Sequence, residues 1–129
     1  MDTIRRAYSK NYNWMFEDST GFFARWGRNP KDDPEYSPFG PEIADIEIST
    51  ICHGPNGVPC KACYKSNTGS GINMSYETFV DIFDKLSSTK NLLQIAFGVG
   101  DIDGNPDLFK MMSYCRQNRV VPNITINGS

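Results

Sequence analysis

The chain has 129 residues, of which 39% are hydrophobic, and its 13 basic and 15 acidic residues give a formal net charge of −2. A chain of this length can form one domain that buries about two thirds of its unfolded surface. The near-neutral charge disfavours nucleic acid or anionic lipid as the main partner. No run approaches the roughly 18 apolar residues of a membrane span, and the start MDTIRRAYSK lacks the apolar region of a signal peptide. We therefore expect a cytoplasmic protein with neither a membrane nor a nucleic-acid partner.

Residues 1–41 are rich in aromatic residues and in turn formers. The turn segment 18–21 is flanked by aromatic side chains, namely Trp14, Phe16, Phe22, Phe23 and Trp26. This pattern predicts a hairpin with a four-residue connection. The proline-containing segments 29–34 and 37–41 cannot continue a helix or a central strand. We therefore expect a first domain, residues 1–41, that consists of a small N-terminal hairpin and a coil lead-in.

A regular pattern of strands and helices is predicted from residue 43 onward. Residues 43–50 alternate apolar and polar side chains with the period of a strand. Ser75 can cap a helix whose apolar residues share one face, namely Phe79, Ile82, Phe83 and Leu86. The apolar run 92–97, which is bounded by a glycine, indicates a second, buried strand.

A second helix and a third strand follow. Asn105 is expected as the N-cap and Pro106 as the first helical residue, and the apolar face comprises Leu108, Met111, Met112 and Cys115. Residues 120–126 are the third predicted strand. Strands that alternate with helices through short connections indicate a parallel sheet covered by helices. Ligands of such sheets bind beyond the carboxyl ends of the strands, where the cysteine loop and the loop 98–104 are expected.

Three cysteines form a C-x7-C-x2-C array directly after the first predicted strand. They are Cys52, Cys60 and Cys63, and two glycines and two prolines bend the intervening loop. Thiolates are soft ligands that select zinc, copper(I) or iron-sulfur clusters. Because the chain shows no secretion signal, a metal or redox site is favoured over two disulfides.

The number of ligands distinguishes the candidate metals. Structural zinc needs a fourth ligand, for which the chain offers His53 or Cys115. His53 adjoins Cys52, so the two side chains would have to reach one ion from neighbouring positions. Cys115 lies on the apolar face of its helix, where a cysteine acts as a small hydrophobic residue. Three thiolates and one open position therefore remain, which suits a cluster that binds substrate.

These residues resemble the radical S-adenosylmethionine superfamily, in particular its peptide-modifying, maturase-like (SPASM-like) branch. The segment Cys60-Lys61-Ala62-Cys63-Tyr64 is similar to the end of the family's cysteine loop, with seven instead of three residues between the first two cysteines. Residues 97–108, FGVGDIDGNPDL, resemble the glycine-rich segment of the family. Residues 123–128, NITING, resemble its third strand and T-N-G ending. The likeness covers residues 43–128.

The resemblance implies a 4Fe-4S cluster on Cys52, Cys60 and Cys63, with S-adenosyl-L-methionine bound to the fourth iron. Reductive cleavage of the sulfonium would give a 5′-deoxyadenosyl radical that abstracts hydrogen from the substrate. The residues implied along this cofactor are Gly98, Gly100, Asp101, Ala62 and Tyr64. No residue is assigned a catalytic role. The implied partners are a peptide or another macromolecular substrate and a reduced flavodoxin- or ferredoxin-type electron donor.

The resemblance also implies a fold. The expected architecture is a partial (β/α) TIM-like barrel, in which a strand-helix-strand-helix-strand parallel sheet follows the N-terminal hairpin. Residues 42–129 would then form the first half of a radical S-adenosylmethionine barrel, and the missing C-terminal half becomes a possible partner. The alternative is a non-catalytic α/β module that holds zinc or a cluster for structural reasons.

Overall fold

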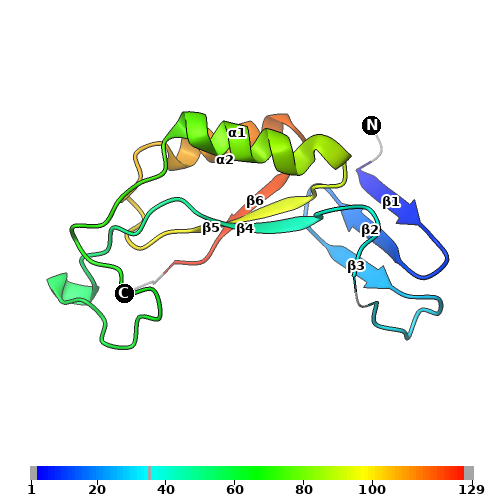
Figure 1. Ribbon diagram of the computed structural model, residues 1–129, viewed down its shortest axis with the longest axis horizontal. Helices are drawn as coiled ribbons and strands as arrows, with labels where there is room; N and C mark the ends of the chain where they lie inside the picture. The colour runs from blue at the N-terminus through cyan, green and yellow to red at the C-terminus, as the bar shows by residue number, and fades with distance from the viewer. Residues whose placement is uncertain (1–2, 35, 127–129) are drawn as a thin grey trace.

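The computed structural model describes residues 3–34 and 36–126 of the chain, so Asn127 and Gly128 of the expected T-N-G ending lie outside the described residues. Two sheets and two helices make up this part (Figure 1). The elements in chain order are β1 (Ile4–Tyr8), β2 (Asn13–Glu17), β3 (Phe23–Trp26), β4 (Ile43–Glu47), α1 (Tyr76–Leu86), β5 (Gln94–Gly98), α2 (Leu108–Gln117) and β6 (Val121–Ile124). Short 3-10 turns lie at Pro55–Gly57 and Ser87–Thr89.

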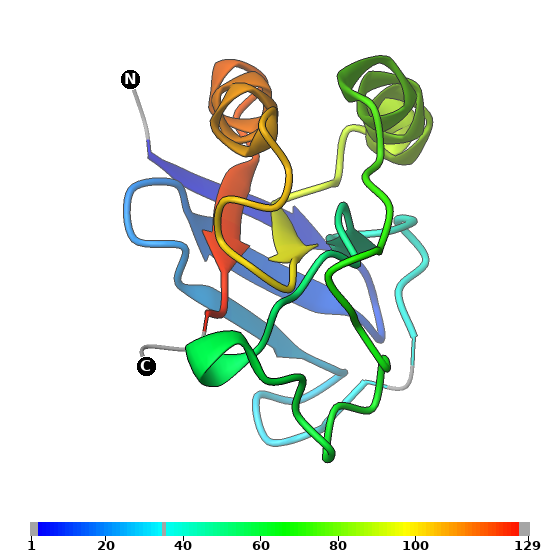
Figure 2. The same ribbon diagram turned by 90° about the vertical axis from the view of Figure 1, so that its left-hand side faces the viewer.

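The second sheet is parallel and has the order β4-β5-β6. Both helices cover the same face of this sheet and leave the other face open (Figures 1 and 2). The core between sheet and helices is built from buried apolar residues that include Ile46, Ile48, Ile95, Phe97, Phe79, Phe83, Leu108, Met111 and Cys115. Because side chains alternate along a strand, the residues between these core positions, such as Asp45 and Ala96, face the open side.

Helix α1 begins where the sequence pattern predicts, whereas α2 begins later than predicted. The Ser75 hydroxyl accepts a hydrogen bond from the Thr78 N–H, which confirms the predicted cap of α1. α2 begins at Leu108, two residues later than predicted, and residues 106–107 form a turn. The Asn105 side chain still accepts from the Asp107 N–H, as an N-cap side chain does. No helix in the described residues is long and apolar enough to cross a membrane.

The first sheet is antiparallel, has the order β1-β2-β3, and packs against the starts of β5 and β6. Its inner face contributes Trp14 and Phe16 to a second core with Leu93 and Val121. The Asp18 carboxylate at the β2–β3 turn forms ion pairs with Arg5 and Arg119, which tie this sheet to the segment after α2.

The expectation of a partial TIM-like barrel is wrong. A barrel requires one sheet whose tilted, staggered strands close around an axis, whereas the six strands described here divide into an antiparallel and a parallel sheet of three strands each, with only two helices. The expected N-terminal hairpin is also wrong in extent, since β1 makes it a three-stranded sheet. The sequence IRRAY of β1 does not show the apolar alternation that predicts a strand, because its inward-facing residue is Arg5. The Arg5 side chain packs over the Phe16 ring.

Candidate functional site

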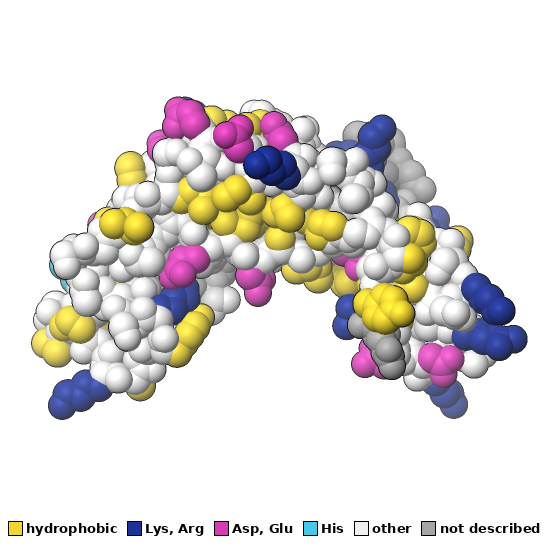
Figure 3. All heavy atoms as spheres, in the orientation of Figure 1, with side chains coloured by type: hydrophobic (Ala, Val, Ile, Leu, Met, Phe, Trp, Pro, Cys, Tyr) yellow, Lys and Arg dark blue, Asp and Glu magenta, His cyan; other side chains and the backbone are white. Residues whose placement is uncertain are grey.

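The three cysteines of the C-x7-C-x2-C array line a single pocket with a volume of about 960 Å³. The pocket lies at the carboxyl ends of β4 and β5 and extends over the open face of the parallel sheet. This is the hollowed underside of an arch-shaped molecule, opposite the helices (Figure 3). Other predicted residues on its wall are Ala62, Tyr64, Gly98 and Gly100. The structure thus brings together every predicted site residue except Asp101.

Cys52 is held from one side by the segment that precedes α1. Its N–H donates to the Thr68 carbonyl at 2.9 Å, and the Thr50 N–H donates to the Ile72 carbonyl at 2.9 Å. These bonds explain why β4 ends at Glu47 rather than at the predicted Thr50. The chain leaves the parallel sheet there and pairs with residues 68–73 instead.

The loop after β5 holds Cys52 from the other side. A Cβ on Gly100 would lie 2.3 Å from the Ile51 carbonyl oxygen and 2.5 Å from the Cys52 Cβ, closer than real side chains approach. Gly100 therefore allows the two loops to touch. Gly98 is less confined, because a Cβ there would lie 3.1 Å from the Glu47 Cα and 3.3 Å from the Lys65 Nζ.

Backbone N–H groups of the turn after Cys63 donate hydrogen bonds to its sulfur. Those of Asn67 and Lys65 have the largest effect and lower the pKa of the Cys63 thiol, with smaller contributions from the Ser66 N–H and the Lys65 charge. The turn that arranges them is closed by the Cys63 N–H, which donates to the Cys60 carbonyl at 3.2 Å. Hydrogen bonds and a nearby cation favour the thiolate, the form that binds metals.

Asp101 faces the cysteine loop instead of the pocket. Its carboxylate accepts hydrogen bonds from the His53 backbone N–H at 3.1 Å and from the His53 Nδ1 at 2.5 Å. The His53 side chain is the main reason why the pKa of Asp101 is lowered. Both residues, which sequence reasoning treated separately, thus form one contact between the two loops.

Two polar residues of the pocket were missed by the sequence analysis. Lys65 pairs with Glu47 at 3.2 Å, and its side chain is only 22% exposed. The Asn67 Oδ1 is buried and has no hydrogen-bond partner among the described residues. The position of both residues within four of Cys63 was an available signal, but the pairing with Glu47 depends on the fold.

The three cysteines share the pocket wall without forming a preassembled metal site. Among residues 3–34 and 36–126, no group of three or more His, Cys, Asp or Glu side chains is arranged to hold a metal ion. A structural zinc ion needs four ligands at about 2.0–2.3 Å from one point, whereas iron-sulfur clusters are held by cysteine thiolates. All four cysteines are free, and Cys115 is fully buried, with a pKa raised to about 12 by desolvation.

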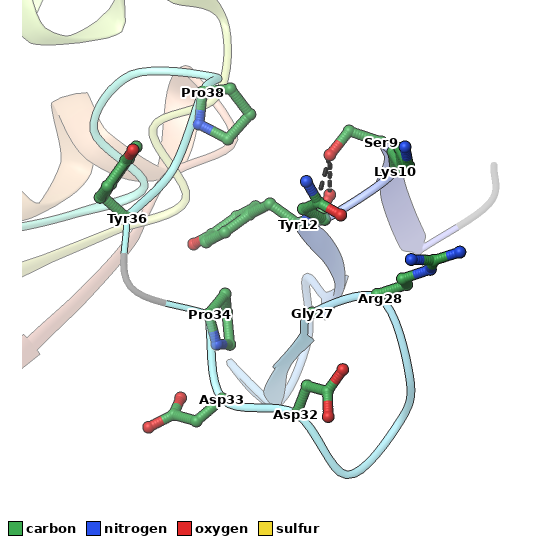
Figure 4. Close-up of a pocket in the computed structure, with 11 residues that line it drawn as sticks. Ser9, Lys10, Tyr12, Gly27, Arg28, Asp32, Asp33, Pro34, Tyr36 and Pro38 are labelled. Atoms are coloured by element: carbon green, nitrogen blue, oxygen red, sulfur yellow. Dashed lines mark hydrogen bonds between the residues drawn. The ribbon is translucent and has the colours of Figure 1, made fainter.

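A second pocket, of about 590 Å³, lies beside the antiparallel sheet and contains none of the predicted site residues (Figure 4). Several of its polar groups have hydrogen-bond partners. The Ser9 hydroxyl donates to the Tyr12 carbonyl, the Tyr12 hydroxyl donates to buried Glu42, and Asp32 accepts from Asn29. Among the described residues that line this pocket, no buried polar side-chain atom lacks a hydrogen-bond partner.

Comparison with protein-family models, with curated proteins and with solved structures finds no significant match. The functional reading of the chain therefore depends on the chemistry of the cysteine pocket itself.

Proposed function

We propose that the chain holds a 4Fe-4S cluster on Cys52, Cys60 and Cys63 and binds S-adenosyl-L-methionine at the iron that no cysteine ligates, as in radical S-adenosylmethionine enzymes. The observation that carries the proposal is the single pocket that contains all three thiols together with Gly98 and Gly100. A 4Fe-4S cluster with bound S-adenosyl-L-methionine supplies one-electron cleavage of the sulfonium and hydrogen abstraction from a substrate.

The residues of the chain have separate tasks in this proposal. Two loops hold Cys52, and hydrogen bonds from backbone N–H groups favour the thiolate form of Cys63. Cys60 is exposed, lies on the same turn as Cys63 and is the third cysteine ligand. Asn67 also lines the pocket, and its oxygen has no hydrogen-bond partner among the described residues, so it is a candidate acceptor for a ligand N–H. Lys65 offers a cation for a carboxylate group.

The cysteine pocket is large enough to hold a substrate next to the cofactor. A pocket of about 960 Å³ is at the upper end of the roughly 300–1,000 Å³ range of small-molecule sites. Its open side admits a side chain of a peptide or of another macromolecule, which we propose as the substrate class. A flavodoxin- or ferredoxin-type protein would supply the electron, and the reducing cytoplasm is the compartment that suits free thiols.

Anaerobic reconstitution with iron and sulfide tests the proposal. We expect a brown protein with close to four iron and four sulfide ions per chain, and loss of both in the variants Cys60→Ala and Cys63→Ala. Cys115→Ala is the matched control and should load like the wild type, because this thiol is buried away from the pocket. A colourless protein with one tightly bound zinc would support the structural module instead.

A further inference from the structure

Asp101 makes the most extensive contact between the cysteine loop and the rest of the protein. Its backbone N–H donates to the Ile51 carbonyl at 2.8 Å. Its carboxylate accepts from the backbone and the ring of His53. One residue thus bonds to Ile51 and His53, the two residues on either side of Cys52.

The loop has few other attachments. Besides its contacts with Asp101, the start of the loop is held by the Cys52 N–H, which donates to the Thr68 carbonyl at 2.9 Å. From Gly54 to Pro59, the hydrogen bonds of the described residues are internal to the loop, from the Gly57 N–H to Gly54 and from the Val58 N–H to Pro55. The His53 ring also lies against Gly69, where a Cβ would be 2.9 Å from its Cδ2. A seven-residue interval with two glycines costs more entropy to order than a short one, so a fixed point next to Cys52 matters more in this chain.

We propose that Asp101 is a positioning residue for Cys52: its bonds to His53 hold the first turn of the long cysteine loop, so that the Cys52 thiol remains on the pocket wall before any metal binds. Asp101 acts through the loop and does not contact the cofactor. The inference rests on the proposed function for the role of Cys52, whereas the order of the loop itself can be measured without a cluster.

Hydrogen exchange of the metal-free full-length chain tests the loop directly. In Asp101→Ala we expect the amides of Cys52, Gly57 and Val58 to exchange at least tenfold faster than in the wild type, with the amides of α1 unchanged. The His53 amide is uninformative, because the substitution removes its acceptor. Asp101→Asn keeps a side-chain oxygen for this amide and should restore part of the protection. Asp103→Asn, at an exposed position of the same loop, is the matched control.

The reconstituted protein provides the second readout. We expect iron transfer to a chelator to be at least tenfold faster from Asp101→Ala than from Asp103→Asn, and His53→Ala to resemble Asp101→Ala because it breaks the same contact from the other side. Loop exchange equal in Asp101→Ala and the control overturns the proposal, whether or not the wild type binds iron. Weaker S-adenosyl-L-methionine binding by Asp101→Asn with unchanged loop exchange also overturns it, since Asp101 would then be a cofactor ligand. Failure of the wild type to bind iron contradicts the proposed function alone.

Discussion

Replacement of Asn105 by alanine should be the most destabilising polar substitution near the site. Asn105 is 3% exposed, and its amide donates to the Ile48 carbonyl at 2.8 Å and to the Met74 carbonyl at 3.0 Å. Its side-chain oxygen accepts from the Asp107 N–H at 2.9 Å. This single side chain thereby joins the end of β4 to the starts of both helices.

The expected cost follows from these three bonds. Each contributes about 0.5–1.5 kcal/mol net, so their loss lowers the free energy of unfolding by about 3 kcal/mol. The Ile48 carbonyl keeps a second donor, the Met74 N–H at 2.9 Å, which limits the penalty there. The Met74 carbonyl has no such replacement in the described residues. A loss of this size is a large part of the 5–15 kcal/mol that a domain typically has.

Urea unfolding of Asn105→Ala, followed by tryptophan fluorescence, measures this cost. The midpoint should fall with an unchanged m-value, because the surface exposed on unfolding stays the same. Asn123→Ala, at an exposed position of β6, is the control and should change the free energy of unfolding by no more than about 0.5 kcal/mol. A cost below about 1 kcal/mol for Asn105→Ala would refute the role of this residue as the junction of strand and helices.

Three further predictions concern the loops, the thiols and the acid response. Gly100→Ala forces the Ile51 backbone away and should cost about 1–3 kcal/mol in urea unfolding and impair iron loading, whereas unchanged loading would show that the close contact is dispensable. A thiol reagent should modify three thiols in the native chain and the fourth, Cys115, only after unfolding, and a native count of four would contradict its burial. Hydrogen bonds from Ser19 and Thr20 lower the pKa of Glu17 from 4.5 to about 2. The stabilisation is therefore complete above pH 4.5 and lost as the pH falls toward 2, so urea midpoints of Glu17→Gln should decline less than those of the wild type over this range.

The helices were the part of the fold that the sequence pattern predicted well. Ser75 supplies a cap, and Phe79 and Phe83 recur at helical spacing, so local chemistry and packing agree on α1. β1 could not be predicted in the same way, because Arg5 occupies an inward position, where its guanidinium contacts the Phe16 ring, Asp18 and the Arg119 carbonyl. An arginine at an inward-facing position of a strand depends on contacts with residues that are distant in the sequence.

The candidate site shows the same division between local and distant information. The spacing of Cys60 and Cys63 made them candidate ligands of one centre, and the glycine-rich loop indicated a close approach of backbone. The direction of the Asp101 side chain was not predictable, because His53 lies 48 positions earlier in the chain. The barrel expected from the family resemblance failed because a local pattern of strands and helices does not specify how many strands one sheet contains.

The electron paramagnetic resonance spectrum of the reduced, reconstituted protein tests the central claim most directly. If three thiolates hold a four-iron cluster with one open iron, the spectrum should be that of a reduced 4Fe-4S cluster and should change when S-adenosyl-L-methionine is added. Protein that carries no inorganic sulfide, or a cluster spectrum that the compound leaves unchanged, would contradict the account.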